Sequence, residues 1–190
     1  MIVVCDSTIL IGLAKLGKLD LLKEIFHKVF IPKEVFKEVV ERGKGKPGYK
    51  TIKEAAWIET KTVKDKIQVA FLQGSLEKGE AEVLVLGTEL AADIILMDEE
   101  KARKSAAIAG FEIMGLLGLF ILAKNLGLIH EVHPLVDKLM INKFRISNKI
   151  IEQTLKKAVK CKVAINPRLK MSLLLKNLPL KVSLLGVADS

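Results

Sequence analysis

The chain has 190 residues, half of them hydrophobic, and its 31 Lys and Arg against 22 Asp and Glu give a formal net charge of +9 at pH 7. This length fits one domain with a sizeable core, and a charged fraction of 28% suits a soluble protein. The positive excess favours polyanionic partners, nucleic acid first and an anionic membrane surface second, unless it marks only a solvated lysine-rich surface.

The first part of the chain alternates short apolar runs with helical patterns, punctuated by glycine and proline. The first apolar run stops at a carboxylate, Asp6, and Pro32 opens a later helix because proline is tolerated in a first turn. In chain order we predict a strand over 2–5, a helix from Ser7 or Thr8, a break at Gly17, a helix capped by Asp20, a strand over 29–31, a helix from Pro32 and a flexible basic loop over 43–48.

The second part continues the alternation of helices and apolar strands. This pattern predicts a parallel α/β sheet covered by helices on both faces. The predicted elements are a helix over 49–56, an edge strand over 57–60, a helix at the end of the polar stretch 62–73, an apolar helix from Gly79, a buried strand over 94–97, a helix over 99–109, a strand over 111–114, a helix over 115–125 capped by Gly127, and helices over 134–140 and 147–158.

The composition changes at Val159. Beyond it, basic residues have almost no acidic counterparts, prolines interrupt the pattern, and the leucine clusters show no clear periodicity. We expect residues 159–190 to form either an added helix or hairpin that covers an exposed face, or a loosely ordered tail.

Cysteines, histidines and apolar runs disfavour several classes of protein. Cys5 and Cys161 form neither a metal-ligand spacing nor a disulfide framework, and Cys5 lies in an apolar strand as a core thiol. The opening residues form a strand rather than a secretory signal, and the longest uncharged apolar run, 113–123, is too short to span a bilayer. We therefore expect a cytoplasmic protein. Surface or capping roles are expected for the histidines, His27, His130 and His133.

Four carboxylates stand where such a fold brings side chains together. Asp6 and Asp98 end apolar strands, Glu38 lies about a turn and a half into a helix, and Glu80 lies in a first helical turn. Ligands bind at the carboxyl edge of an open α/β sheet. Clustered carboxylates without His or Cys ligands indicate Mg²⁺ or Mn²⁺ rather than zinc, and without a cation their repulsion raises a pKa. Such an ion activates water for phosphodiester hydrolysis.

Each of these acids also has an ordinary structural role open to it. Asp6 can cap the helix that follows it. Glu38 can be a solvated helix residue, while Glu80, Glu82 and Asp98 can simply favour helix N-termini electrostatically. The joint pattern of four acids, rather than any single one, points to a metal site.

The chain resembles PIN-domain proteins of the archaeal and bacterial branch named domain of unknown function 3368. The resemblance implies a three-layer α/β/α fold around a parallel sheet, an acidic pocket for Mg²⁺ or Mn²⁺, and cleavage of single-stranded RNA. It also implies, for several members, a toxin role beside an antitoxin. It covers residues 1–158 as a nuclease domain, which leaves 159–190 as a basic extension. The matching stretches are 4–11, 31–39, 78–83, 95–106 and 114–124.

The resemblance also implies roles for individual residues. The family's acidic positions correspond to Asp6, Glu38, Glu80 and Asp98, its frequent hydroxyl to Thr8, a frequent second acid to Glu99, and a common arginine to Arg103. Glu80 is preferred as the third ligand because it opens the helix nearer the strand ends, and Glu82 is the alternative. The usual Gly-Thr-x-Gly is replaced by Gly-Leu-Leu-Gly, so Leu116 stands where a hydroxyl is usual and activity is expected to be weaker if that hydroxyl positions substrate or metal.

Our leading hypothesis is a metal-dependent ribonuclease in which Arg103 and the basic loop, with Arg42, Lys44 and Lys46, contact phosphates. That loop can equally be a mobile connection. The alternative is a catalytically silent nucleic-acid-binding protein with the same fold. A phospho-acceptor receiver domain is disfavoured, since Asp6 lacks an acidic neighbour. As partners we expect RNA, an antitoxin protein and a second copy of the chain, a homodimer formed through helices near 10–22 and 119–126.

Overall fold

The sheet of the protein has five parallel strands. A computed structural model describes residues 1–46, 48–142 and 144. Within them the strand order is β3-β2-β1-β4-β5, with every neighbouring pair parallel, which confirms the predicted parallel α/β fold. The strands are β1 (Val3–Cys5), β2 (Val29–Pro32), β3 (Ile58–Lys61), β4 (Ile94–Leu96) and β5 (Ile113–Met114).

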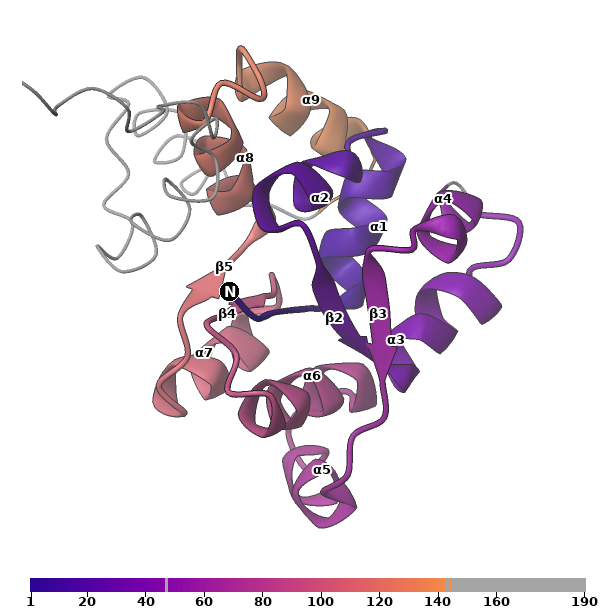
Figure 1. Ribbon diagram of the computed structural model, residues 1–190, viewed down its shortest axis with the longest axis vertical. Coiled ribbons are helices and arrows are strands. Elements are labelled where there is room, and N and C mark those ends of the chain that lie inside the picture. Colours follow the sequence, from indigo (N-terminus) through magenta and orange to yellow (C-terminus); the bar gives the residue numbers. More distant parts are fainter. Residues whose placement is uncertain (47, 143, 145–190) are drawn as a thin grey trace, which may run out of the picture.

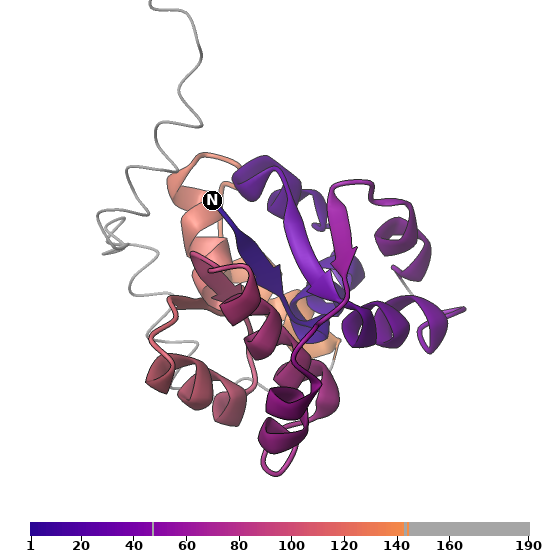
Figure 2. The ribbon, with the colours of Figure 1, turned by 60° about the horizontal axis from the view of Figure 1, so that its bottom comes forward.

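Helices cover both faces of this sheet (Figures 1 and 2). Helices α1, α2 and α4 lie on one face, where α8 also packs on α1, and α6 lies on the other face with its neighbours α5 and α7. The helices are α1 (Ser7–Lys15), α2 (Asp20–Phe26), α3 (Lys33–Phe36), the π-helix η1 (Lys37–Glu41), α4 (Tyr49–Glu54), α5 (Lys66–Leu72), α6 (Lys78–Glu89), α7 (Glu100–Ile108), α8 (Leu116–Asn125) and α9 (His133–Ile141).

Burial explains why the central elements form where they do. Strand β1 lies in the middle of the sheet, and its three residues, Cys5 among them, are fully buried. Helix α6 packs on β1, β2 and β4, which accounts for its unbroken run of buried residues from Ala81 to Gly87. These two elements form the centre of the core and lead directly to Asp6 and Glu80.

The helix predicted from Pro32 differs in detail from the expectation. Pro32 is still extended and ends β2, so the helix begins at Lys33. After Phe36 it passes into π geometry, and the Arg42 N–H donates to the Lys37 carbonyl oxygen at 2.8 Å, a bond across five residues. π-Helical turns occur frequently at functional sites, and this one contains Glu38.

The surface expected to form a homodimer lies largely in the core. Most apolar side chains of 10–22 and 119–126 are buried, because α1, α2 and α8 pack against the sheet and one another. Among the described residues the large exposed apolar side chains are instead Ile67, Phe71, Ile108, Met140 and Ile141.

Two further predictions concern the rest of the chain. The helix predicted over 147–158 and the extension 159–190 lie outside the described residues, as does the domain boundary between them. No helix in the described part of the chain combines the length and apolar character needed to cross a membrane.

Candidate functional site

Asp6 occupies the carboxyl end of the central strand. Its N–H donates to the Leu96 carbonyl oxygen at 2.9 Å, which ties it to the neighbouring strand β4. The residue is 2% exposed, and its carboxylate accepts the Thr8 N–H at 3.4 Å and the Ser7 hydroxyl at 3.5 Å. Burial raises the pKa of Asp6, and the bonds from Ser7 and Thr8 only partly offset this. Asp6 therefore caps α1 and is also a carboxylate held out of water.

Glu38 projects from the π-helical turn toward the start of α6. A methyl group placed on Gly79 would lie 2.7 Å from Glu38 Oε1, so the carboxylate rests against this glycine. Burial raises the pKa of Glu38, the Ser7 hydroxyl bond lowers it, and the nearby charge of Asp6 raises it further. Glu38 is thus half-buried beside Asp6 rather than a solvated helix residue.

Glu80 and Glu82 differ in what they contact. Glu80 Oε2 accepts the Glu77 N–H at 2.9 Å, and Glu77 in turn accepts from Glu80, which forms a capping box. Burial raises the pKa of Glu80, and the charge of Asp6 adds to this. Glu82 is 4% exposed and accepts the Glu34 N–H at 3.2 Å. The charge of Asp6 therefore acts on Glu80, whereas Glu82 contacts the start of α3.

Asp98 follows β4 and meets the start of α8. The Leu116 N–H donates to Asp98 Oδ1 at 3.2 Å and Oδ2 at 3.3 Å, and Arg103 Nη1 lies 3.9 Å from Oδ1. Burial raises the pKa of Asp98, while the Leu116 bond and the Arg103 charge lower it and Asp6 raises it. Leu116 contacts this acid through its backbone, so the contact does not need the hydroxyl usual at this position.

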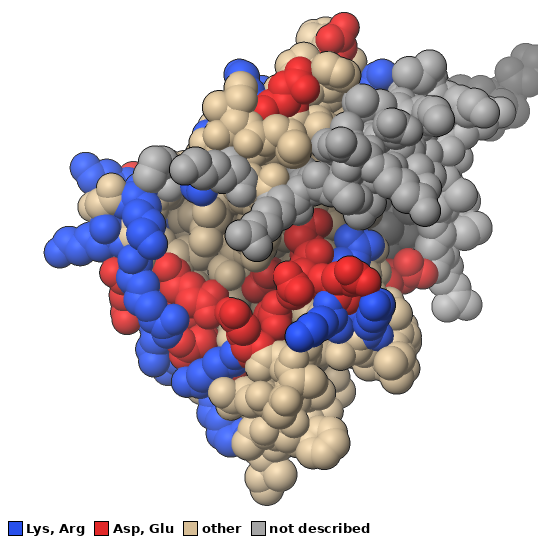
Figure 3. Space-filling model, turned by 180° about the vertical axis from the view of Figure 1, so that it is seen from behind, with Lys and Arg blue, Asp and Glu red and all other residues tan. Residues whose placement is uncertain are grey.

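The charge of Asp6 acts on the other three candidate acids. The carboxylate of Asp6 raises the pKa of Glu38, Glu80 and Asp98, so these three acids stand within electrostatic range of it. Figure 3 shows acidic side chains gathered in a band across this part of the surface, above the protruding α5, with basic side chains on either side. The four acids predicted from the sequence thus converge on the carboxyl edge of the sheet.

The donors fit a hard divalent cation chemically, because all are carboxylate oxygens whose charges disfavour one another. Among the described residues, however, no three Asp, Glu, His or Cys side chains lie close enough together to hold one ion. In this structure Asp6, Glu80 and Asp98 each accept a backbone N–H at the start of a helix. The capping roles open to these residues are therefore real contacts.

The basic residues expected to contact phosphates differ in whether an acidic side chain already pairs with them. Lys44 and Lys46 are exposed on the turn after η1. Arg42 forms an ion pair with the buried Glu34, although 61% of its side chain is exposed. Arg103 lies beside Asp98 with 42% of its side chain exposed. Arg42 and Arg103 are thus held by acids, one of them an acid of the site itself.

Sequence reasoning missed two residues that touch the site. Ser7 was considered only as a helix start, yet its hydroxyl bonds to Asp6 and also lowers the pKa of Glu38 through a hydrogen bond. Gly79 was considered only as the start of a helix, yet Glu38 rests against it. The available signals were a hydroxyl directly after the strand-end acid and a glycine directly before Glu80.

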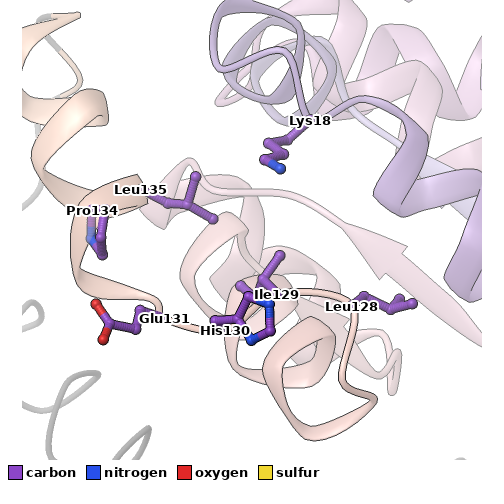
Figure 4. Close-up of a pocket in the computed structure, with 7 residues that line it drawn as sticks. All are labelled: Lys18, Leu128, Ile129, His130, Glu131, Pro134 and Leu135. Atoms are coloured by element: carbon purple, nitrogen blue, oxygen red, sulfur yellow. The ribbon is translucent and has the colours of Figure 1, made fainter.

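A separate hollow of about 340 Å³ lies at the opposite, amino edge of the sheet (Figure 4). It is formed where the α1–α2 and α8–α9 connections meet, and it includes none of the four acids. Its lining residues are Lys18, Leu128, Ile129, His130, Glu131, Pro134 and Leu135.

Comparison with known proteins agrees with this arrangement. A family model described as a PIN domain, domain of unknown function 3368, matches residues 2–160. The match spans all five strands and the four acids. No curated protein matches the chain.

Proposed function

The chain belongs to the PIN-domain family, and we propose that it is a metal-dependent ribonuclease that hydrolyses phosphodiester bonds of single-stranded RNA. PIN domains bind nucleic acids and are generally nucleases. The metal, the RNA substrate and the cleavage reaction are our inference for this chain.

One observation supports the proposal above the others. Asp6 is 2% exposed at the end of the central strand, and its charge raises the pKa of Glu38, Glu80 and Asp98. Burying one carboxylate and placing three others near it disfavours the charged forms. A divalent cation would relieve this repulsion and stabilise the charged carboxylates, so the arrangement suits a metal site.

In the mechanism we propose, Asp6, Glu38, Glu80 and Asp98 would hold Mg²⁺ or Mn²⁺. The bound ion would supply an activated water and neutralise charge developing on the phosphodiester. Ser7 and Thr8 orient Asp6 through the hydrogen bonds that they donate. Glu38 would accept a proton from the attacking water as the water oxygen bonds to phosphorus. The bond from phosphorus to the leaving oxygen would then break, and that oxygen would take a proton from solvent.

Basic side chains bind and orient the RNA in this proposal. Arg103 has N–H groups left for a phosphate beside Asp98, because its side chain is 42% exposed. Arg42, Lys44 and Lys46 extend the contact along the strand. The net charge of +9 supports a polyanionic substrate.

The test is cleavage of a labelled single-stranded RNA by the full chain, with Mn²⁺, with Mg²⁺ and with a chelator. We expect cleavage that needs the metal and is lost in Asp6→Asn. The variant Asp20→Asn, which changes an exposed residue of α2 at the amino edge, should cleave like the wild type. Cleavage that persists in Asp6→Asn would contradict the proposal. RNA binding without any metal-dependent turnover would favour the catalytically silent alternative.

The toxin role, an antitoxin partner, a homodimer and a cytoplasmic location are finer parts of the same proposal, supported by the family resemblance alone. Growth arrest on expression, absent for Asp6→Asn, tests the toxin role. The mass of the purified chain in solution tests the homodimer.

A further inference from the structure

A group of charges around two buried carboxylates joins the helix that contains Glu38 to the helix that contains Glu80. Two carboxylates, Glu34 and Glu82, are 5% and 4% exposed, and three cations surround them. We call this group the charge cluster, and its members are Glu34, Arg42, Lys66, Lys78 and Glu82.

Glu82 holds the beginning of α3. Its Oε2 accepts the Glu34 N–H at 3.2 Å, across 48 residues of sequence. That N–H belongs to the first turn of a helix, where no carbonyl of the same helix is available to it. Glu82 Oε1 lies 3.7 Å from Lys66 Nζ on α5. The carboxylate therefore supplies α3 with a partner that its own sequence lacks.

Glu34 completes the connection in the other direction. Its two oxygens pair with Arg42, at the end of η1, and with Lys78 Nζ at 3.0 Å, in the first turn of α6. Glu38 lies halfway between Glu34 and Arg42, and Gly79, against which Glu38 rests, directly follows Lys78. The contacts thus connect the chain before and after Glu38 to the first turn of α6, and Figure 1 shows α3 beside α6.

We propose that Glu82, with Glu34, is a positioning residue of the candidate nuclease site: it fixes α3 and η1 against the first turn of α6 and so sets the Glu38 carboxylate beside Glu80 and Asp6. This inference rests on the proposed function. It assigns Glu82 a role outside the metal-ligand set.

The chemistry of the cluster argues for positioning rather than for stability. Buried ion pairs are weak contributors to stability, because desolvation offsets most of their attraction. The cations are also well exposed, with 50–61% of their side chains in solvent, so they lose little when a partner is removed. What such a cluster does supply is a defined geometry, and residues that orient metal ligands are worth about 10- to 100-fold in metal affinity or activity.

The experiment compares Glu82→Leu, which removes the acceptor for the Glu34 N–H, with Glu82→Gln, which keeps an acceptor oxygen on a side chain of the same length. Three quantities are measured for each variant. Calorimetry gives the Mn²⁺ affinity, cleavage of a single-stranded RNA gives kcat and KM, and thermal unfolding of the full chain without metal gives the Tm. We expect Glu82→Leu to bind Mn²⁺ about 10- to 100-fold more weakly and to lose kcat by a similar factor, with little change in KM. Glu82→Gln should restore most of both.

Glu89→Leu is the matched control. Glu89 lies on the same helix and also accepts backbone N–H groups of another helix start, those of Lys64 and Asp65 at 2.7 and 2.9 Å, but away from the acids. It should lower Tm while leaving Mn²⁺ affinity and kcat unchanged. A merely structural role for Glu82 would make the two leucine variants behave alike.

The outcomes separate this inference from the function on which it rests. Wild-type Mn²⁺ affinity in Glu82→Leu, with cleavage still lost in Asp6→Asn, overturns the positioning role and keeps the nuclease. If Glu82→Gln loses as much Mn²⁺ affinity as Glu82→Leu, the hydrogen bond that Glu82 accepts from the Glu34 N–H has no positioning role. A wild-type chain that neither binds Mn²⁺ nor cleaves RNA overturns both.

Discussion

Gly79→Ala should damage the proposed nuclease site without damaging the fold. The three atoms nearest to a methyl group at this position all belong to the Glu38 carboxylate, at 2.7, 3.2 and 3.2 Å. Ordinary contact begins near 3.4 Å, so Glu38 Oε1 must retreat by about 0.7 Å. Because the obstructing group is the end of a flexible side chain, the carboxylate moves and the backbone stays.

The expected magnitudes follow from this displacement. Misplacing a catalytic group by about 1 Å costs up to about 100-fold in rate, so we expect a kcat loss of about 10- to 100-fold. Alanine is favoured over glycine within a helix by up to about 1 kcal/mol, less in a first turn, so Tm should stay level or rise. Lower activity with equal or greater stability is the diagnostic combination.

The assay is initial-rate cleavage of single-stranded RNA in Mn²⁺, paired with thermal unfolding of the same preparations. Gly74→Ala is the matched control, because its methyl group would meet only the Phe71 carbonyl oxygen at an ordinary 3.4 Å. Wild-type cleavage by Gly79→Ala would refute the reasoning, since Glu38 would then not need its place beside α6. A fall in Tm that matches the loss of activity would refute it equally.

Three further predictions concern metal, pH and salt. Mn²⁺ at about 100 times its Kd should stabilise the wild type by about 2.7 kcal/mol, which corresponds to a Tm rise of about 5–10 °C in differential scanning fluorimetry. In Asp6→Asn the Tm without metal should be higher than that of the wild type, and added Mn²⁺ should no longer raise it. Because the pKa values of Asp6, Glu38 and Asp98 are raised, the folded state keeps protons that the unfolded state has lost. Metal-free stability in urea titrations should therefore fall as pH rises from their usual pKa values through the raised ones, and less steeply in Asp6→Asn. Lys44→Ala and Lys46→Ala should each raise KM and reduce the salt slope of RNA binding by about one. Arg42→Ala should also lower kcat, because Arg42 pairs with Glu34. Equal kinetic effects of all three substitutions would count against the charge cluster.

Much of the fold follows from local patterns in the sequence. Apolar runs that end in Asp6 and Asp98 predict parallel strands, and the carboxyl ends of such strands meet at one edge. The convergence of these two acids is therefore predictable before any coordinates. Glu38 follows because a helix after a parallel strand begins at that same edge. Glu80 follows because the helix before β4 must run from that edge back to the start of the strand.

What could not be predicted depends on which face of a helix meets the sheet. Glu80 and Glu82 are two residues apart, so they point to opposite sides of α6, and periodicity alone cannot say which side meets Asp6. Packing of α6 on β1 and β2 decides it and turns Glu82 to Glu34, 48 residues away. The π-helical turn at Glu38 likewise arises from contacts between segments rather than from residue propensity.

Leu116 shows how a departure from the family pattern can leave a site contact intact. Its side chain is buried, and a methyl group on Gly12 would lie 2.8 Å from it, so it packs against α1 while its N–H bonds Asp98. Leu116→Ala should cost about 2–5 kcal/mol of stability and leave Mn²⁺ affinity unchanged at low temperature.

Leu116→Pro tests the N–H by itself when it is compared with Leu116→Ala. Position 116 is the first residue of α8, where proline is accommodated, and Gly115 is extended, with φ −91° and ψ 176°, as a residue before proline must be. The proline variant therefore loses the donor to Asp98 and little else beyond what alanine loses. A hydrogen bond to a charged group is worth about 1.5–3 kcal/mol, so Mn²⁺ affinity measured by calorimetry should differ between the two variants by at least about tenfold. Equal affinities would mean that Asp98 is not oriented by this backbone group, and the absent hydroxyl would then become the more important difference.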